Sequence, residues 1–282
     1  MTSPQEYYLK VGSLKTRCLI AGEGSPLMLL HGAGGSGSGW LTNIAPLAAR
    51  HRVYAPDLPG HGRTDKSASG EYRFKDFPKF ATDLMNELGI ERAHIVGHSL
   101  GGAIALHMAI DSPERVGKLV LISSAGLGRE ISPLVRLITI PRLGETLAAL
   151  GYTRRVKEYA RRVRSAAKNA THITDELMES IYRVEQTPGQ YKTTLKVLRS
   201  FSNWRGQKPA FLDHIRKGLP SIKSPTLVMW GRQDDYLPYT HGEKAVRSIP
   251  DARLEVFDPC GHLPMFEYPE RLNKLILDLI GE

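Results

Sequence analysis

The sequence predicts an α/β protein: a mainly parallel β-sheet covered by helices on both faces, with a helical insertion. Short apolar runs typical of strands buried on both faces alternate with helix-forming stretches along most of the 282 residues. Such alternation indicates crossover connections and therefore parallel strands. The alternation stops between about Gly126 and Leu219, where strong strand-like runs are missing. We therefore predict a core of residues 1–125 and 220–282 and an inserted helical cap of residues 126–219.

The predicted elements follow in chain order. Strands at residues 7–11 and 14–20 are joined by the Gly12-Ser13 turn, which favours a hairpin. Six more apolar runs predict buried strands, at residues 26–30, 52–55, 94–97, 118–122, 226–230 and 254–257. Helical stretches lie between them, at residues 40–50, 77–88, 100–110, 242–248 and 269–280. In the insertion we expect helices at residues 153–167 and 174–186, with breaks at Thr187-Pro-Gly and Lys208-Pro.

Composition excludes several classes of protein. With 41% hydrophobic and 24% charged residues, 27 Gly and 18 Pro, the chain is neither collagen-like nor low-complexity nor disulfide-rich. Its longest apolar runs, such as residues 119–122, are far shorter than the ~18 residues of a membrane span. The N-terminus lacks a basic stretch followed by an apolar one, which argues against a secretory signal. Cys18 and Cys260 are far apart and favour reduced thiols, so we expect a cytoplasmic protein.

The net charge of +9 is concentrated in the predicted insertion. Residues 129–217 hold 18 Lys and Arg against eight Asp and Glu, whereas the rest of the chain holds 20 against 21. Such a segment is either a patch for nucleic acid or anionic lipid, or the solvated face of a helical insertion. It has no interleaved aromatic pattern and no nucleic-acid signature. We therefore favour the solvated face and expect no nucleic-acid partner.

The strongest chemical signal is the segment Gly97-His98-Ser99-Leu100-Gly101. It follows a predicted strand and opens an apolar helix, so Ser99 would stand on a sharp, exposed turn. The two glycines relieve crowding at this turn, and the amides and positive dipole at the start of the helix point at the serine. A serine that only caps the helix is the alternative. We predict that Ser99 is a nucleophile.

A hydroxyl is a poor nucleophile without a base, and two later segments supply candidates. His262 follows the last predicted strand, at the sheet edge where Ser99 is expected, and is the predicted base. A histidine of a surface loop is the alternative. Asp234 follows the strand at residues 226–230 and is predicted to orient the base and stabilise its cation. Asp235 is expected to be solvated, and Asp258 is a weaker rival for this role.

Two backbone amides are needed to hold a developing oxyanion. One is predicted to be the amide of Leu100, directly after the nucleophile. The other is predicted to come from the glycine-rich loop that starts at His31, with Ala33 preferred and Gly34 as the alternative. The His31 side chain is expected to brace this loop and not to take part in catalysis.

The same loop also matches a dinucleotide-binding fingerprint. Its glycines at 32, 34 and 37 have the required spacing, and Asp57 lies where a ribose-binding acid would be. However, the motif follows the third predicted strand, and nucleotide binding would leave Ser99, Asp234 and His262 unexplained. Metal binding has little support, because the histidines and cysteines form no cluster with ligand spacing. We expect neither a cofactor nor a metal.

Together these segments resemble the α/β-hydrolase fold over nearly the whole chain. The resemblance rests on His31-Gly, Asp57-Leu-Pro-Gly-His-Gly, Gly97-His-Ser-Leu-Gly-Gly, Gly231-Arg-Gln-Asp234 followed by Pro238, and Gly261-His262 followed by Glu267 and Pro269. The order Ser, Asp, His is that of triads on this fold. The resemblance implies a mostly parallel eight-stranded sheet with a helical cap over the site, and the triad Ser99, Asp234 and His262. A serine at this turn argues against the dehalogenases and epoxide hydrolases of the fold, which use aspartate there.

Within the fold, the chain is similar to carboxylesterases and to the C–C bond hydrolases that cleave aromatic ring-fission products. Residues 251–257 and 173–177 are similar to the second group. The chain departs from that group at His98, where those enzymes usually carry Asn, at Leu263, where they usually carry Trp, and at Ile181, where their cap arginine falls. These departures favour a serine esterase that acts through an acyl-enzyme. C–C hydrolysis, acyl transfer or perhydrolysis on the same triad, and a binding protein with a silent triad are the alternatives.

The substrate is expected to be a small ester or other acyl compound. Gly34, Trp40 and Leu263 are predicted to line its pocket, with Leu100 and Met265 as further candidate walls; the apolar residues among them could equally belong to the core. Arg183 is near the position of the family's cap arginine, and we expect it to favour anionic substrates. A homodimer is compatible with the sequence.

Overall fold

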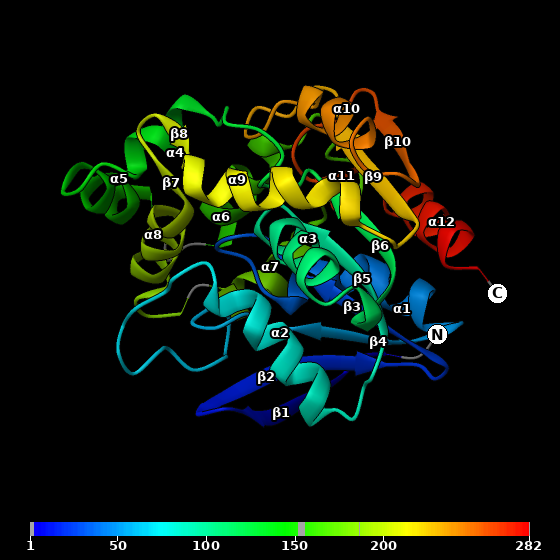
Figure 1. Cartoon of the computed structure of the whole chain (residues 1–282). Coiled ribbons are helices and arrows are strands. Elements are labelled where there is room, and N and C mark those ends of the chain that lie inside the picture. The colour runs from blue at the N-terminus through cyan, green and yellow to red at the C-terminus, as the bar shows by residue number, and fades with distance from the viewer. Residues whose placement is uncertain (1–2, 152–155, 186, 282) are drawn as a thin grey trace.

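The computed structural model describes residues 3–151, 156–185 and 187–281, and in this part of the chain eight strands form one sheet (Figure 1). Their order across the sheet is β1-β2-β4-β3-β5-β6-β9-β10. β2 runs antiparallel to β1 and β4, and every other neighbouring pair is parallel. The strands are β1 (Gln5–Val11), β2 (Leu14–Ala21), β3 (Ser25–Leu30), β4 (His51–Pro56), β5 (Ala93–His98), β6 (Val116–Ile122), β9 (Thr226–Gly231) and β10 (Ala252–Phe257). The predicted eight-stranded, mostly parallel sheet is confirmed.

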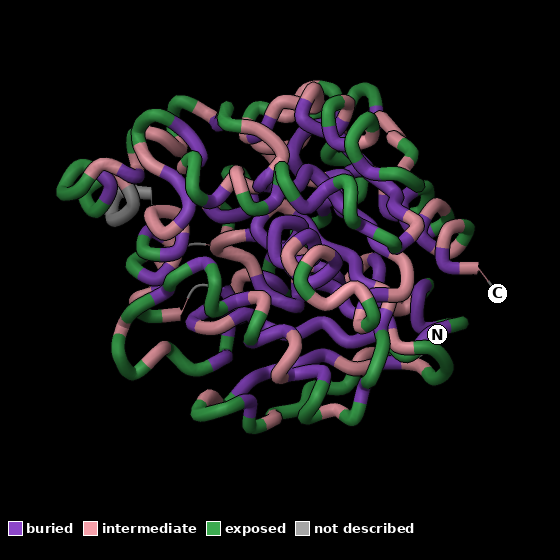
Figure 2. The backbone as a smooth tube through the Cα atoms, viewed as in Figure 1, coloured by how far each residue is buried: buried purple, intermediate pink, exposed green. Residues whose placement is uncertain are grey.

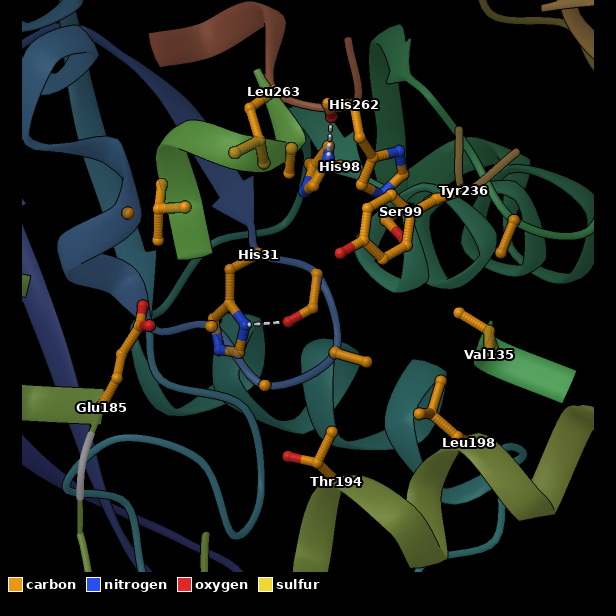
Figure 3. A pocket seen from close by; sticks show the side chains of 18 of the residues that line it. His31, His98, Ser99, Val135, Glu185, Thr194, Leu198, Tyr236, His262 and Leu263 are labelled. Carbon is orange, nitrogen blue, oxygen red and sulfur yellow. Dashed lines mark hydrogen bonds between the residues drawn. The ribbon is translucent and has the colours of Figure 1, made fainter. Parts of the chain in front are cut away.

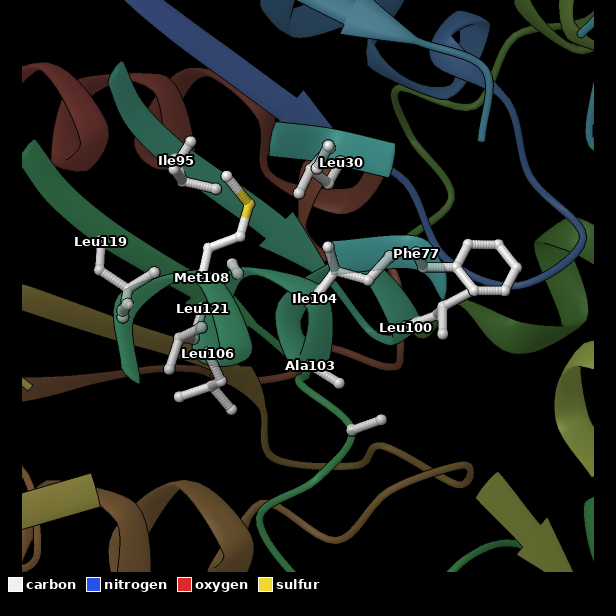
Figure 4. Close-up of a cluster of buried hydrophobic side chains, with 14 of the residues drawn as sticks. Leu30, Phe77, Ile95, Leu100, Ala103, Ile104, Leu106, Met108, Leu119 and Leu121 are labelled. Carbon is white, nitrogen blue, oxygen red and sulfur yellow. The ribbon is translucent and has the colours of Figure 1, made fainter. Parts of the chain in front are cut away.

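Helices cover both faces of this sheet, because its central strands are apolar on both sides. Along β3, Leu27 and Leu29 belong to one hydrophobic cluster, whereas Met28 and Leu30 belong to the other. The first cluster is completed by α1 (Leu41–Ala48) and α12 (Pro269–Ile280). The second is completed by α2 (Asp76–Glu87), α3 (Leu100–Asp111) and α10 (Thr240–Val246). Figure 4 shows the side chains of α3 packed on this second face, and Figure 2 shows buried backbone through the central strands.

The segment between β6 and β9 is helical, as expected. It contains α4 (Pro133–Ile138), α5 (Leu143–Gly151), α6 (Val156–Ala166), α7 (Asp175–Glu185), α8 (Gln190–Phe201), α9 (Pro209–Gly218) and a small hairpin of β7 (Ser202–Asn203) and β8 (Gly206–Gln207). The predicted breaks at Thr187-Pro-Gly and Lys208-Pro fall between α7 and α8 and directly before α9. Two ends of the helices expected in this segment lie outside the described residues: the first three residues of the helix at 153–167, and Gln186 at the end of the helix at 174–186.

The order of the strands places a crevice at the carboxyl ends of β3 and β5. The chain passes from β3 to β4 on one side of β3, and then to β5 on its other side. Connections that diverge in this way leave a gap where ligands of open α/β sheets bind. The loops after β3 and β5 carry the glycine-rich segment and Ser99, so both predicted groups start from this point. No helix in the described residues is both long enough and apolar enough to cross a membrane.

Candidate active site

Ser99 stands on a strained turn between β5 and α3. Its backbone has φ 52° and ψ −112°, in a region that residues other than glycine rarely adopt. Its amide donates to the carbonyl of Ile122 at 3.0 Å, and its carbonyl accepts the amide of Ala125 at 3.0 Å, so β6 and the loop after it hold the turn. A side chain at Gly97 would collide with the backbone of Gly101. Glycine at position 97 is therefore a steric requirement of the turn.

His262 and Asp234 form a hydrogen-bonded pair. Nδ1 of His262 donates to Oδ2 of Asp234 at 2.8 Å, and the carboxylate is fully buried. Oδ1 of Asp234 accepts the amides of Tyr236 and Leu237 at 2.8 and 3.0 Å. Burial opposes ionisation of Asp234, but the charge and hydrogen bond of His262 and these two amides hold its pKa below the usual value. The pair fixes the ring so that Nε2 is the nitrogen left for other contacts.

Ser99 and His262 line the same cavity, and Figure 3 shows their side chains in one part of its wall. No hydrogen bond joins the Ser99 hydroxyl to the His262 ring in the described structure. Hydrogen bonds between catalytic groups are often formed only when substrate is bound. The structure thus brings Ser99, His262 and Asp234 to one site, with the acid and the base already paired.

Three further side chains hold His262 in place. His98 donates from Nε2 to the His262 carbonyl at 2.9 Å, and Tyr236 stacks on the His262 ring with centroids 4.8 Å apart. The buried Glu267 carboxylate accepts the amides of Gly261 and Leu263 on both sides of His262. The roles of His98 and Tyr236 were not predicted from the sequence, because they depend on contacts between distant segments.

The candidate oxyanion amides are free to donate to a ligand oxygen. Within the described residues, the amides of Ala33, Gly34 and Leu100 donate to no acceptor. Leu100 follows the nucleophile directly, and Ala33 and Gly34 line the cavity. Both alternatives for the second amide therefore stay open.

The cavity has a volume of about 600 Å³ and lies between the sheet loops and the helices α4, α6, α7 and α8. Of the predicted substrate-binding residues, Gly34, Trp40 and Leu263 line it, as does Met265. Of the two positions considered for the Leu100 side chain, pocket wall or core, the structure shows the core: it is fully buried in the hydrophobic cluster around α3.

Arg183 does not line the cavity. Its side chain is 70% exposed and pairs with Glu179 one turn away on α7, at 2.6 Å. The arginine that lines the cavity is Arg162 on α6. The sequence could not distinguish these arginines, because the outcome depends on which face of each helix is turned inward.

The loop that matched a nucleotide fingerprint has a different use. Asp57 is buried, accepts the amides of Gly37 and Arg63, and pairs with Arg17 at 3.2 Å. It therefore anchors the loop and is not available to a ribose. His31 braces the same loop as expected: Nε2 accepts the amide of Leu58 at 2.9 Å, and Nδ1 donates to the carbonyl of Gly32. Burial lowers the pKa of His31 to about 4, so the ring is neutral.

The two rival acids lie at the surface. Asp258 pairs with Arg232 at 2.7 Å and accepts from Gln233. Asp235 pairs with Lys168 at 2.7 Å and is 71% exposed. Neither forms a hydrogen bond with His262 in the described structure, whereas Asp234 does.

One cluster with metal-ligand chemistry was not expected. His107 and Asp111 on α3 and His214 on α9 have donor atoms within 4.8 Å of one another. His214 bonds to Asp111 at 2.9 Å, its ring stacks on His107, and Nδ1 of His107 lies 3.4 Å from the same carboxyl group. None of them lines the cavity. The sequence signal for this cluster is limited to the four-residue spacing of His107 and Asp111.

Known proteins share the fold of this chain and much of its sequence. The family model of the alpha/beta hydrolase fold matches residues 25–269. A 2-hydroxy-6-oxo-6-phenylhexa-2,4-dienoate hydrolase of Comamonas testosteroni is 36% identical over 266 residues, which cover 93% of this chain and 90% of the relative. A 2-hydroxy-6-oxononadienedioate/2-hydroxy-6-oxononatrienedioate hydrolase of the same species is 34% identical and covers 93% and 89%. The structure of a meta-cleavage product hydrolase from Pseudomonas fluorescens IP01 superposes with a TM-score of 0.79, at 27% identity, over 97% of this chain and 96% of that one.

Proposed function

The chain belongs to the α/β-hydrolase fold family, and on this premise we propose that it is a C–C bond hydrolase of aromatic ring-fission products. The observation that carries the proposal is the similarity to two enzymes named for this substrate class, over about nine-tenths of each chain. This reverses the preference for an esterase that the departures at His98, Ile181 and Leu263 suggested. Ester hydrolysis therefore becomes the second candidate.

The proposed chemistry assigns one role to each group of the site. The Ser99 hydroxyl attacks the ketone carbon next to the scissile bond and gives its proton to Nε2 of His262. Asp234 orients the ring and stabilises its positive charge. The amides of Leu100 and of Ala33 or Gly34 hold the negative oxygen.

Collapse of this adduct breaks the C–C bond, and the carbon leaving group takes the electron pair and the proton from His262. That step requires a leaving group whose negative charge is delocalised, as in a dienolate, before it takes the proton. Water, deprotonated by His262, then attacks the acyl-Ser99 ester and releases the acid. No step needs a cofactor or a metal.

Ester hydrolysis uses the same groups with an alkoxide as the leaving group. It is favoured by Leu263 and His98, at positions where C–C hydrolases usually carry Trp and Asn, and by the exposed position of Arg183. Acyl transfer and perhydrolysis differ only in the nucleophile that replaces water. Competing nucleophiles and product analysis separate them from hydrolysis.

The test compares one ring-fission substrate, 2-hydroxy-6-oxo-6-phenylhexa-2,4-dienoate, with a series of p-nitrophenyl esters. We expect loss of the yellow dienolate to have the larger kcat/KM, and Ser99→Ala to lower it by about three or more orders of magnitude. Ser180→Ala, on the exposed face of α7, is the control and should retain activity. Turnover of esters alone would support the second candidate. If Ser99→Ala retained the rate of the parent protein, Ser99 would not be the nucleophile.

A further inference from the structure

A buried acid lines the same cavity as Ser99 and His262, and the proposed reaction does not use it. Glu185 is the last residue of α7 and is 6% exposed. Figure 3 shows its carboxyl group at the wall of the cavity opposite Tyr236. A buried carboxylate without a cationic partner is costly, so its presence in a pocket wall calls for a reason.

The contacts of Glu185 leave acceptor capacity unused. Oε1 accepts the hydroxyl of Ser36 at 3.2 Å, and Oε2 accepts the hydroxyl of Tyr159. A carboxylate has about four acceptor positions, so two remain. Ser36 lies in the loop after β3 and Tyr159 lies on α6, so the carboxyl group is fixed from both sides of the cavity.

The charges around Glu185 do not neutralise it. Burial raises its pKa to about 7, and the charge of buried Asp57 acts in the same direction. Arg162, on α6, lowers the pKa by a smaller amount, and its side chain is exposed to solvent. Solvent screens the charge of Arg162, whereas the charge of Glu185 is inside the wall and is not screened to the same extent.

We propose that Glu185 makes its part of the cavity a subsite for a hydrogen-bond donor or a cationic group of the substrate, and that it selects against a carboxylate there. The proposal deepens the proposed function: it rests on Ser99 as the reacting centre, and it applies whether the bond cleaved is C–C or an ester. Substrates with a hydroxyl, an amide or an ammonium at this end would bind through the two unused acceptor positions.

The selection depends on pH, with a defined sign. A carboxylate ligand can approach only if Glu185 is protonated, so its binding takes up a proton and weakens as pH rises through about 7. A cationic ligand prefers the ionised form, so its binding strengthens over the same range. Asp57, Arg162 and Tyr159 are the other ionisable groups that act on Glu185, and burial raises the pKa of Tyr159 further above its usual value.

The experiment measures binding and does not depend on turnover. The Ser99→Ala protein is titrated calorimetrically with methyl 6-aminohexanoate, methyl hexanoate and monomethyl adipate, which are cationic, neutral and anionic. At about pH 8 we expect the cationic ester to bind about 10-fold more tightly than the anionic one. At about pH 6, where Glu185 is mostly neutral, the difference should fall to about 2-fold.

A matched pair of variants locates the effect. Glu185→Gln in the Ser99→Ala background should remove both the preference and its pH dependence, while Glu176→Gln, an exposed glutamate on the same helix, should change neither. Thermal unfolding checks that Glu185→Gln is folded, and the pH dependence of the parent tests the proposal without that variant. Equal affinities at about pH 8, or an unchanged preference in Glu185→Gln, would overturn the proposal. Since no step here requires catalysis, this result is independent of whether Ser99 cleaves a ketone or an ester.

Discussion

The side chain of His98 lies beside His262, with ring centroids 4.8 Å apart, and donates to the His262 carbonyl. Burial and the neighbouring His262 lower the pKa of His98 to about 3, so it stays neutral with its proton on Nε2. A charged ring at this position would repel the cation that forms on His262 during the reaction. Position 98 therefore needs a side chain that donates a hydrogen bond without carrying a charge.

Replacing His98 tests this positioning role at the scale of one residue. His98→Ala leaves the buried His262 carbonyl without a donor, so we expect a loss of about 1–3 kcal/mol in the free energy of unfolding. kcat should fall with little change in KM, because the base loses its orientation but substrate contacts remain. His98→Gln can place a donor at a similar reach and should restore part of kcat. Urea unfolding and steady-state kinetics measure both effects. A fall in KM alone would contradict the role.

The loop between β10 and α12 is organised by one buried carboxylate. Glu267 in α11 (Pro264–Glu267) accepts the amides of Gly261 and Leu263, which flank His262, and also the amides of Lys168 and Asn169 at 2.7 and 3.0 Å. The last two follow α6, so this side chain joins the loop of the base to the inserted helices. The position of His262 thus depends on an element far from it in the sequence.

Glu267→Gln tests whether this carboxylate links the loop of His262 to the inserted helices. An amide places N–H groups against backbone donors, so we expect a loss of about 2–3 kcal/mol in unfolding free energy and a lower kcat. Glu270→Gln, an exposed change in the first turn of α12, is the control and should be close to neutral. Denaturant unfolding and turnover of the preferred substrate are the readouts. Parental stability in Glu267→Gln would show that the loop holds its shape without this carboxylate.

Across the whole molecule, several histidines are buried in the neutral form. Burial lowers the pKa of His31 to about 4 and that of His61 and His98 to about 3. In the unfolded chain the value is about 6.5, so the unfolded state binds more protons between about pH 4 and 6.5. Each of these residues therefore stabilises the fold fully above this range and loses that contribution as pH falls. Glu185 acts in the opposite direction, because its folded pKa of about 7 is raised.

The pH dependence of stability follows from these signs. Between about pH 7.5 and 5, the lowered pKa values of the buried histidines, with His94 and His107 at about 4 among them, reduce the free energy of unfolding, and the raised pKa of Glu185 offsets about 2 kcal/mol of this loss. We therefore expect a net loss of several kcal/mol, which urea unfolding at the two pH values measures. In Glu185→Gln the loss should be larger by about 2 kcal/mol. Equal stability at both pH values would mean that the histidines are solvated.

The sequence by itself determined the alternation of strands and helices along the chain and the choice of candidate reacting residues. Apolar runs of four to six residues, bounded by glycine, are a local signal, and so are the turns that place Ser99, Asp234 and His262 after strands. The boundaries proposed for the helical insertion, residues 126–219, rest on the same local pattern, and they stay a prediction. The steric need for glycine near Ser99 is also local, which is why the motif could be interpreted before the fold was known.

Only the tertiary structure decided which side chains face the cavity. Arg183 and Glu185 are two residues apart on α7, yet the helix turns the arginine to solvent and the acid into the wall. Leu100 could have been a pocket wall or a core residue, and its side chain lies in the core. The apolar residues Met178, Ile181 and Val184 mark the inward face of α7, and Glu185 lies on that face whereas Arg183 does not. What this face meets is set by packing between segments far apart in the chain. The candidate reacting residues could therefore be predicted from local patterns, but the contacts that complete the cavity could not.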